Sequence, residues 1–145
     1  MAMWLFTDAI MAGRPIKLFN HGNMRRDFTY VDDVAEAVVR LIGRSPAGDP
    51  RWSSDAPDPA TSRAPWRVYN IGNHTPVDLM EVVRLIETAL GKKAIAELMP
   101  MQPGDVRETC ADVEALQKAV GFSPNTPIAD GIGRFIDWYR AFHGV

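Results

Sequence analysis

Cysteine is almost absent from this sequence of 145 residues, because Cys110 is the single one. A disulfide within the chain is therefore excluded, which fits a reducing cytoplasm, and we expect Cys110 to be a small buried apolar residue. Histidine is scarce as well, since His21, His74 and His143 lie far apart and lack the spacing of metal ligands. The sequence accordingly predicts a cytoplasmic protein without a metal site.

Neither sign of charge dominates, since 16 basic residues face 18 acidic ones and the formal net charge is −2. Without a basic excess we expect no nucleic-acid partner, and a phosphate-bearing ligand would need a local basic site. Long apolar runs are missing too, because none approaches the roughly 20 residues that span a bilayer. The apolar start, MAMWLFTDAIMAG, lacks a basic leader and is typical of a helix rather than a signal peptide. We therefore expect no membrane partner.

Motifs of self-contained catalysis are also missing. The glycines do not form the spaced cluster that lets a backbone approach a pyrophosphate. No nucleophile elbow, phosphate loop or Ser/His/Asp set can be nominated. We expect no catalytic residue and no bound cofactor on this chain, only groups that hold a ligand.

Strand and helix patterns alternate along the chain, which predicts an α/β or α+β fold. Strands are expected at 16–19, 26–31 and 67–72, with weaker candidates at 94–98 and 108–111. Helices are expected at 3–12, from Asp32 or Asp33 to about 42, at 76–90 after a cap at Thr75, at 113–120 after a cap at Asp112, and from Thr126-Pro127 to about 142. Gly91 and Gly121 are expected to end helices. The apolar stripes of the first and last helices include Leu5 and Phe142, which should be buried.

Residues 44–66 interrupt this alternation. The segment contains five prolines with serine, alanine and aspartate between them, so it cannot form a regular helix or strand. Loops of this length are uncommon in compact domains and serve as lids, as binding loops or as disordered insertions. An ordered loop and a disordered insertion both stay open at this point.

Two adjacent arginines, Arg25 and Arg26, stand at the start of a predicted strand. The planar guanidinium suits phosphate oxygens, and such charge-assisted hydrogen bonds are strong. The alternative is that both arginines are solvated or pair with Asp27, Asp32 or Asp33, and spacing alone favours this alternative. Because successive strand residues face opposite sides, we expect at most one arginine to point into a site.

A second candidate for ligand binding is the stretch MQPGDVRE at 101–108. Its Pro103-Gly104 pair signals a turn that would present Gln102, Asp105 and Arg107 together. An amide, a carboxylate and a guanidinium can hold ribose hydroxyls and phosphates. An ordinary polar loop is the alternative, which composition by itself favours.

Three motifs, RRDFTYVDD, YNIGN and MQPGDV, follow one another in an order and spacing that are jointly specific. With their surroundings they cover nearly all of the chain and resemble the C-terminal portion of bacterial UDP-glucuronate 4-epimerases. These enzymes belong to the NAD-dependent epimerases/dehydratases of the extended short-chain dehydrogenase/reductase superfamily. UDP-glucose 4-epimerase or another nucleotide-sugar dehydratase is the alternative. Gln102 favours the glucuronate enzyme, because related galactose epimerases tend to carry arginine there.

The resemblance implies an α/β fold, namely the C-terminal substrate-binding portion of a Rossmann-type enzyme, with a small mixed sheet and helices. Residues 1–145 would form a nucleotide-sugar-binding fragment with the insertion at 44–66, and the NAD-binding half would be absent. In the parent isomerase, NAD oxidises C4 of the sugar, the 4-keto sugar turns over, and hydride returns to its other face. The family's Tyr-x-x-x-Lys pair and glycine fingerprint lie in the absent half, so the fragment should be inactive alone. Supply of surface-polysaccharide precursors is a family-level expectation.

The resemblance also implies roles for single residues. Arg26 would contact the UDP diphosphate, with Arg25 as its neighbour, and Asp105 would bind a ribose hydroxyl. Gln102 lies in the same turn as Asp105. The uracil would be flanked by Lys17, Leu18 and Phe19.

Two further expectations concern the assembly. Strands such as 67–71 would lose their sheet partners without the NAD-binding half, so we expect a homo-oligomer formed by exposed edges and apolar faces. A hypothesis from a different class is a standalone, non-catalytic interaction module.

Overall fold

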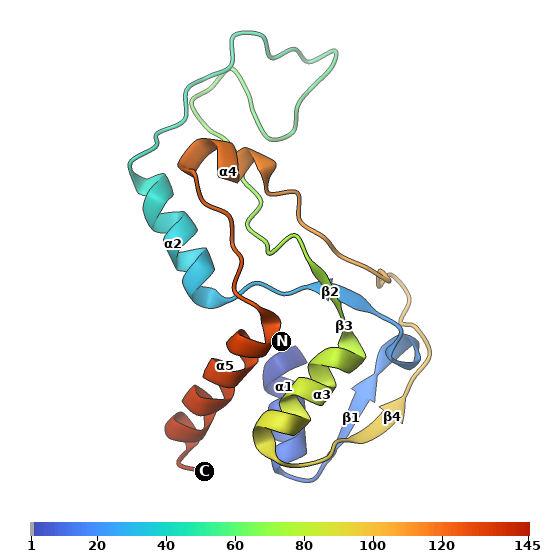
Figure 1. Ribbon diagram of the computed structural model, residues 1–145. Coiled ribbons are helices and arrows are strands. Elements are labelled where there is room, and N and C mark those ends of the chain that lie inside the picture. Colours follow the sequence, from blue (N-terminus) through green and yellow to red (C-terminus); the bar gives the residue numbers. More distant parts are fainter. Residues whose placement is uncertain (1) are drawn as a thin grey trace. The chain divides into compact units, whose positions relative to one another are not determined.

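The computed structural model describes residues 2–145, which divide into two compact units (Figure 1). Unit 1 holds the chain up to Phe28, together with Thr75–Cys110 and Thr126–Val145. Unit 2 holds Thr29–His74 and Ala111–Asn125. Each unit is therefore assembled from segments that are distant in sequence.

Every named strand of the described chain belongs to unit 1. Its elements are α1 (Ala2–Met11), β1 (Pro15–Leu18), the 3-10 helix η1 (Phe19–Gly22), β2 (Arg25–Asp27), β3 (Pro76–Asp78), α3 (Leu79–Leu90), β4 (Ile95–Leu98) and α5 (Ile128–His143). Strands β1 and β4 pair in parallel, from Pro15 opposite Ile95 to Leu18 opposite Leu98. Strands β2 and β3 pair antiparallel, with Arg26 opposite Val77. The fold class is α/β as predicted, with two small two-stranded sheets.

The core of unit 1 forms where α1 and α5 pack against α3, and α1 against β1. Its buried side chains recur at helical spacing on α3 and at alternate positions on β1, as the two periodicities require. The cluster consists of Phe6, Ala9, Ile10, Ile16, Leu18, Val82, Val83, Ile86, Leu90, Ile132 and Ile136. Two long side chains that were expected to be buried are instead exposed: Leu5 is 62% accessible and Phe142 is 67% accessible.

Unit 2 consists of α2 (Val31–Ile42), α4 (Glu114–Val120) and irregular connections. Helices α2 and α4 contact each other, and the Arg40 guanidinium lies 4.8 Å from the centre of the Phe122 ring. The Asp33 carboxylate accepts a hydrogen bond of 3.2 Å from the Asn125 backbone N–H. Within residues 44–66, no helix or strand is present beyond an isolated bridge between Ser53 and Ala56, as the five prolines predict.

The starts of several helices were predicted wrongly. Thr75 does not cap α3, because residues 76–78 form β3 and pair with β2, so that α3 begins at Leu79 after Asp78. Here strand pairing outweighs local capping chemistry. Asp32 and Asp33 lie in the first turn of α2, behind the capping position at Tyr30. The predicted ends hold, since Gly91 and Gly121 adopt the left-handed conformation at the ends of α3 and α4.

Two predicted strands are wrong and a third is shorter than expected. Residues 67–72 and 108–111 form no strand, although Arg25 and Glu108 make one isolated bridge. Strand β2 ends at Asp27 instead of continuing to residue 31. A segment becomes a strand only where a neighbouring strand pairs with it, and within the described part of the chain, residues 67–72 have a single backbone hydrogen bond, from Val68 to Ala60, and no paired strand.

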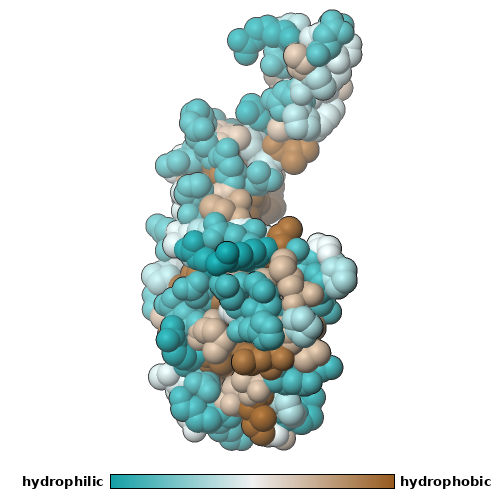
Figure 2. Space-filling view, turned by 90° about the vertical axis from the view of Figure 1, so that its right-hand side faces the viewer, coloured by the Kyte–Doolittle hydropathy of each residue, from teal (hydrophilic) through white to brown (hydrophobic). Residues whose placement is uncertain are grey.

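The surface carries two further features. Cys110 is exposed, contrary to the expectation that it is buried. Figure 2 shows apolar residues reaching the surface in separate spots between polar ones. Among residues 2–145, no helix has both the length and the hydropathy that crossing a membrane requires.

Candidate functional site

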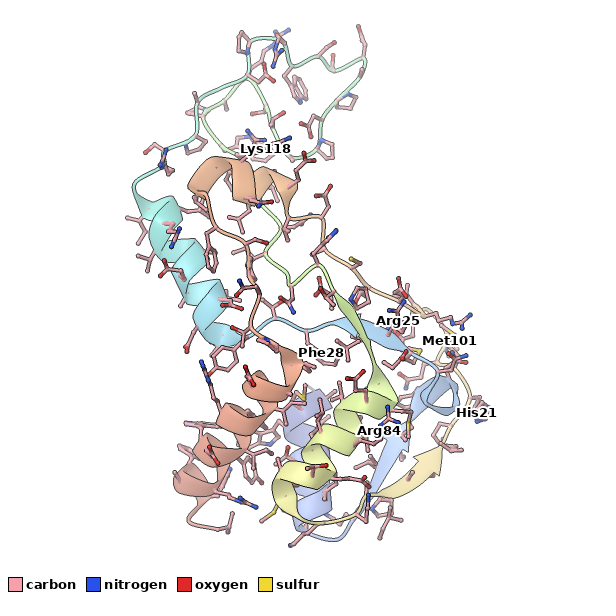
Figure 3. All side chains as sticks on the ribbon, viewed as in Figure 1. His21, Arg25, Phe28, Arg84, Met101 and Lys118 are labelled. Carbon is pink, nitrogen blue, oxygen red and sulfur yellow. The ribbon has the colours of Figure 1, made fainter. Side chains whose placement is uncertain are left out.

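The candidate site is built entirely from unit 1, around β2 and the segment that follows β4. The Arg25 backbone N–H donates to the Arg107 carbonyl at 2.9 Å, and the Thr109 N–H donates to the Arg25 carbonyl at 3.2 Å. These two bonds hold residues 107–109 alongside β2. Figure 3 shows Arg25 on β2, with His21 on η1 and Met101 on the segment after β4.

Arg26 is held in a fixed orientation by three acceptors. Its Nη1 donates to the carbonyls of Arg25 and Arg107, at 2.8 and 3.1 Å. Its Nη2 donates to Oδ1 of Asp105 at 2.9 Å, where both side chains are largely shielded, with exposed fractions of 23% and 32%. A guanidinium has five N–H donors, so within the described chain the Nε–H and one Nη2–H of Arg26 remain available. Both can donate to an anion without disturbing the existing bonds.

Asp105 combines a fixed oxygen with an open one. Its Oδ1 accepts from both Arg26 and the Val106 backbone N–H, the latter at 2.8 Å. Its Oδ2 makes no hydrogen bond to the described residues and can accept one from a hydroxyl group. The turn that carries Asp105 closes through its own N–H, which donates to the Gln102 carbonyl at 3.2 Å, and Gly104 supplies the positive φ of 82°.

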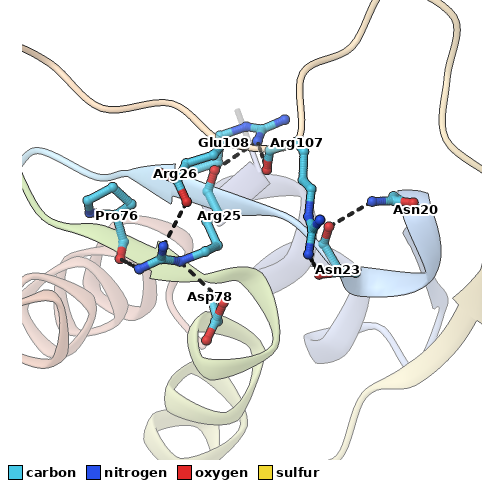
Figure 4. Close-up of polar contacts among 8 residues, drawn as sticks. All are labelled: Asn20, Asn23, Arg25, Arg26, Pro76, Asp78, Arg107 and Glu108. Carbon is cyan, nitrogen blue, oxygen red and sulfur yellow. Dashed lines mark hydrogen bonds and ion pairs between the residues drawn. The ribbon is translucent and has the colours of Figure 1, made fainter.

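Arg25 is engaged differently from Arg26 (Figure 4). Its Nη1 donates to Oε2 of Glu108 at 2.7 Å, and its Nη2 donates to the Pro76 carbonyl at 3.0 Å. Its Nε lies 3.6 Å from Oδ1 of Asp78. The carboxylate partners of the two arginines are thus Asp78, Asp105 and Glu108, not the nearby aspartates 27, 32 and 33 that spacing suggested.

Arg107 brings a third guanidinium to the same region. Its Nη2 donates to Oδ1 of Asn23 at 3.3 Å, and no carboxylate of residues 2–145 forms an ion pair with it. Asn23 also accepts a bond of 2.7 Å at its carbonyl from the Asn20 side chain. The sequence predicts that Arg107 lies in the turn but assigns it no role in binding. No sequence motif indicates a role for Asn23 or Glu108.

The three residues that were expected to flank uracil, Lys17, Leu18 and Phe19, differ in their exposure. Lys17 is exposed, and Phe19 is partly buried at the start of η1. Leu18 is fully buried in the core of unit 1, and its carbonyl accepts the Met99 N–H at 3.0 Å. The Leu18 side chain therefore cannot face a ligand. Gln102 is exposed at the turn before Asp105.

Metal ligands do not gather at this site. No group of three or more His, Cys, Asp or Glu side chains among residues 2–145 could hold a metal ion. The side chains gathered at the site are three guanidinium groups, which can bind anions, and the carboxylates of Asp78, Asp105 and Glu108.

Comparison with known proteins links this arrangement to a family. Residues 2–72 match the family described as NAD dependent epimerase/dehydratase. Protein CapI of Staphylococcus aureus is 50% identical over 143 residues, which are 99% of this chain and 43% of that protein. A probable UDP-glucuronate 4-epimerase of Rhizobium meliloti (strain 1021) is 43% identical over 140 residues, which are 96% of this chain and 41% of that protein.

A solved structure extends the comparison to the fold. The UDP-glucuronic acid 4-epimerase of Bacillus cereus, in complex with UDP-glucuronic acid and NAD, superimposes with a TM-score of 0.76 at 22% identity. The match covers 98% of this chain and 40% of that one. The fold is therefore similar to that of a portion of this enzyme, and the chain spans about two fifths of the length of the relatives it matches.

Proposed function

We propose that this chain is the nucleotide-sugar-binding portion of a 4-epimerase that acts on a UDP-sugar, since residues 2–72 match the NAD dependent epimerase/dehydratase family. The whole of residues 1–145 would serve this purpose, with 44–66 as an insertion. UDP-glucuronate is the proposed sugar nucleotide, since a relative at 43% identity is named a probable UDP-glucuronate 4-epimerase.

The orientation of Arg26 is the observation that carries this proposal. Three hydrogen bonds fix its guanidinium, so the remaining N–H groups lose little freedom on meeting a phosphate oxygen. Asp105 stands beside it with Oδ2 open, which suits a ribose hydroxyl next to a diphosphate. We assign Arg26 to the diphosphate and Asp105 to the ribose, with Gln102 in the same turn.

The uracil would lie against β1 and the start of η1. Lys17 and Phe19 can contact it with their side chains. Leu18 can contribute only through its backbone, because its side chain belongs to the core.

NAD is assigned to the remaining part of a longer enzyme, because the described residues do not fit a dinucleotide. The glycines with positive φ occur singly, at the ends of helices and in turns, and do not form a cradle of consecutive backbone amides. The proposed contribution of this chain is therefore to bind and orient the nucleotide, and the chain alone is expected to be inactive.

Titration of UDP into the 145-residue chain by calorimetry tests the proposal. Arg26→Ala should weaken binding by about 1.5–3 kcal/mol, as the loss of a charge-assisted hydrogen bond predicts. Arg40→Ala is the matched control, since Arg40 is also an ion-paired arginine but lies in unit 2, where it pairs with Glu36. Uridine should bind more weakly than UDP, because it lacks the diphosphate.

Three results would contradict the proposal. If Arg26→Ala binds UDP as tightly as the original chain does, Arg26 does not contribute to UDP binding. Interconversion of sugar nucleotides by the chain alone would place catalysis on these residues. A chain that binds no UDP would instead favour the standalone interaction module.

The proposal also favours UDP-glucuronate over UDP-glucose. Gln102 supports the glucuronate enzyme. Parallel epimerase assays with both sugar nucleotides on an enzyme that includes this chain would decide between them.

We also propose that copies of this chain associate through unit 2. Val31, Val39 and Ile42 on α2 are 67%, 62% and 77% exposed, and residues 67–72 are extended without a paired strand among the described residues. Such apolar faces and open edges favour pairing between copies. Sedimentation velocity should show a concentration-dependent shift to larger species, and Val39→Glu should reduce it. A single monomeric species at high concentration would refute this association.

A further inference from the structure

Arg25 connects three separate segments of unit 1. Its guanidinium contacts Pro76 and Asp78 on β3, and it forms an ion pair with Glu108 beyond the turn. Its backbone N–H and carbonyl add two hydrogen bonds to residues 107 and 109. This one residue therefore ties β3 and the segment 107–109 to β2.

The segment that Arg25 ties down carries the groups that orient Arg26. The Arg107 carbonyl accepts from both the Arg25 N–H and the Arg26 Nη1, and Asp105 lies two residues earlier. A displacement of residues 105–108 would move both acceptors at once. The geometry of Arg26 thus depends on contacts made by its neighbour.

Arg25 itself is poorly suited to bind a phosphate. Its terminal nitrogens donate once each and so keep further N–H groups, as in Arg26, but Glu108 and Asp78 place two carboxylates beside this guanidinium. An incoming diphosphate at this guanidinium would meet the negative charges of both. The two adjacent arginines therefore differ in the charge around them, since a single carboxylate contacts Arg26.

We propose that Arg25 is a positioning residue for the nucleotide site, which acts by clamping the segment 105–108 onto β2 so that Arg26 and Asp105 keep their orientation. This role rests on the proposed nucleotide site, but the clamp itself is a property of the free chain. The two can therefore be tested separately.

Hydrogen exchange on the chain without ligand tests the clamp. Arg25→Gln and Glu108→Gln should each raise exchange at the amides of Asp105 and Thr109 by about fivefold, since each removes a tether of this segment. Amides of α3 should exchange as before. Arg40→Gln, which removes an arginine of similar exposure from the Arg40–Glu36 pair, should leave residues 105–109 unchanged. Unchanged exchange at 105–109 in both site variants would overturn the clamp.

Titration with UDP distinguishes positioning from direct contact. If Arg25 positions the site, Arg25→Gln and Glu108→Gln each weaken binding by roughly fivefold, and the double variant is little worse than either single one. If Arg25 binds the diphosphate directly, Glu108→Gln frees its guanidinium and binding is retained or strengthened, which would refute the positioning role. If the original chain does not bind UDP, the proposed nucleotide site is refuted. The hydrogen-exchange experiment tests the clamp independently of that result.

Discussion

The two units of this chain differ in how much apolar surface they bury. Unit 1 encloses a continuous cluster contributed by α1, β1, α3 and α5. In unit 2, the buried apolar side chains among the described residues are Ala37, Val113, Leu116 and Pro124, while the valines and the isoleucine on the outside of α2 stay exposed. Because burial of apolar area is the main favourable contribution to folding, unit 1 has the means to be stable by itself, and unit 2 has much less.

This difference has a functional consequence. Every residue assigned to the nucleotide, including Arg26, Asp105 and Lys17, belongs to unit 1. A site needs side chains that are held in place by a rigid surrounding structure. The exposed apolar side chains on α2 of unit 2 instead support the proposed association between copies of the chain.

The strongest test of the comparison is a matched pair of isoleucines on helices. Ile86 on α3 is fully buried, and Ile42 at the end of α2 is 77% exposed. Ile86→Ala should lower the free energy of unfolding by about 2–5 kcal/mol, because it removes buried methyl groups and leaves a cavity. In a dilute solution, where the chain is monomeric, Ile42→Ala should change it by less than about 0.5 kcal/mol. Urea titrations followed by circular dichroism measure both.

Equal effects of the two alanine substitutions would break the comparison. A large effect of Ile42→Ala in particular would show that α2 is covered, as it would be in an oligomer. Repeating the titrations at several protein concentrations separates an effect of association, which weakens on dilution, from an effect within the monomer, which does not.

A smaller effect is expected at Glu87, which joins the end of α3 to the connection that leads to β4. Its Oε2 accepts from Lys93 Nζ and its Oε1 accepts from the Ala94 N–H, both at 2.9 Å. The hydrogen bond from Lys93, followed by that from Ala94, lowers the pKa of Glu87 below its ordinary value of 4.5. Glu87→Gln should cost about 1 kcal/mol at neutral pH.

The lowered pKa of Glu87 also determines how the destabilisation by Glu87→Gln depends on pH. A carboxyl group whose pKa is lower in the folded chain stabilises the fold above pH 4.5, and this stabilisation is lost as the pH falls through the folded value. The difference between the original chain and Glu87→Gln should therefore shrink in acid. Glu36→Gln, which breaks the exposed pair with Arg40 in unit 2, should cost only about 0.3–0.5 kcal/mol. A difference for Glu87→Gln that is constant down to acid pH would contradict this account.

Local patterns in the sequence predicted much of unit 1 correctly. The strand beginning near Ile16, the helix containing Ile86 and the stop at Gly91 follow from alternation, from helical periodicity and from the freedom of glycine at positive φ. Pattern reasoning failed at residues 67–72, because an apolar extended segment becomes a strand only beside a partner. It failed again at Pro76–Asp78, where pairing with β2 replaced the expected first turn of a helix.

The sequence by itself determined the α/β class and the similarity to the NAD dependent epimerase/dehydratase family, and it indicated β2 and the turn at 102–105 as candidates for binding a nucleotide. Only the tertiary structure decided that Asp105 meets Arg26 and that Glu108 and Asp78 meet Arg25. These partners stand about 50 to 80 residues from the arginines in sequence. Local spacing favours neighbours along the chain, whereas strand pairing brings distant carboxylates closer, and electrostatic attraction depends on distance in space.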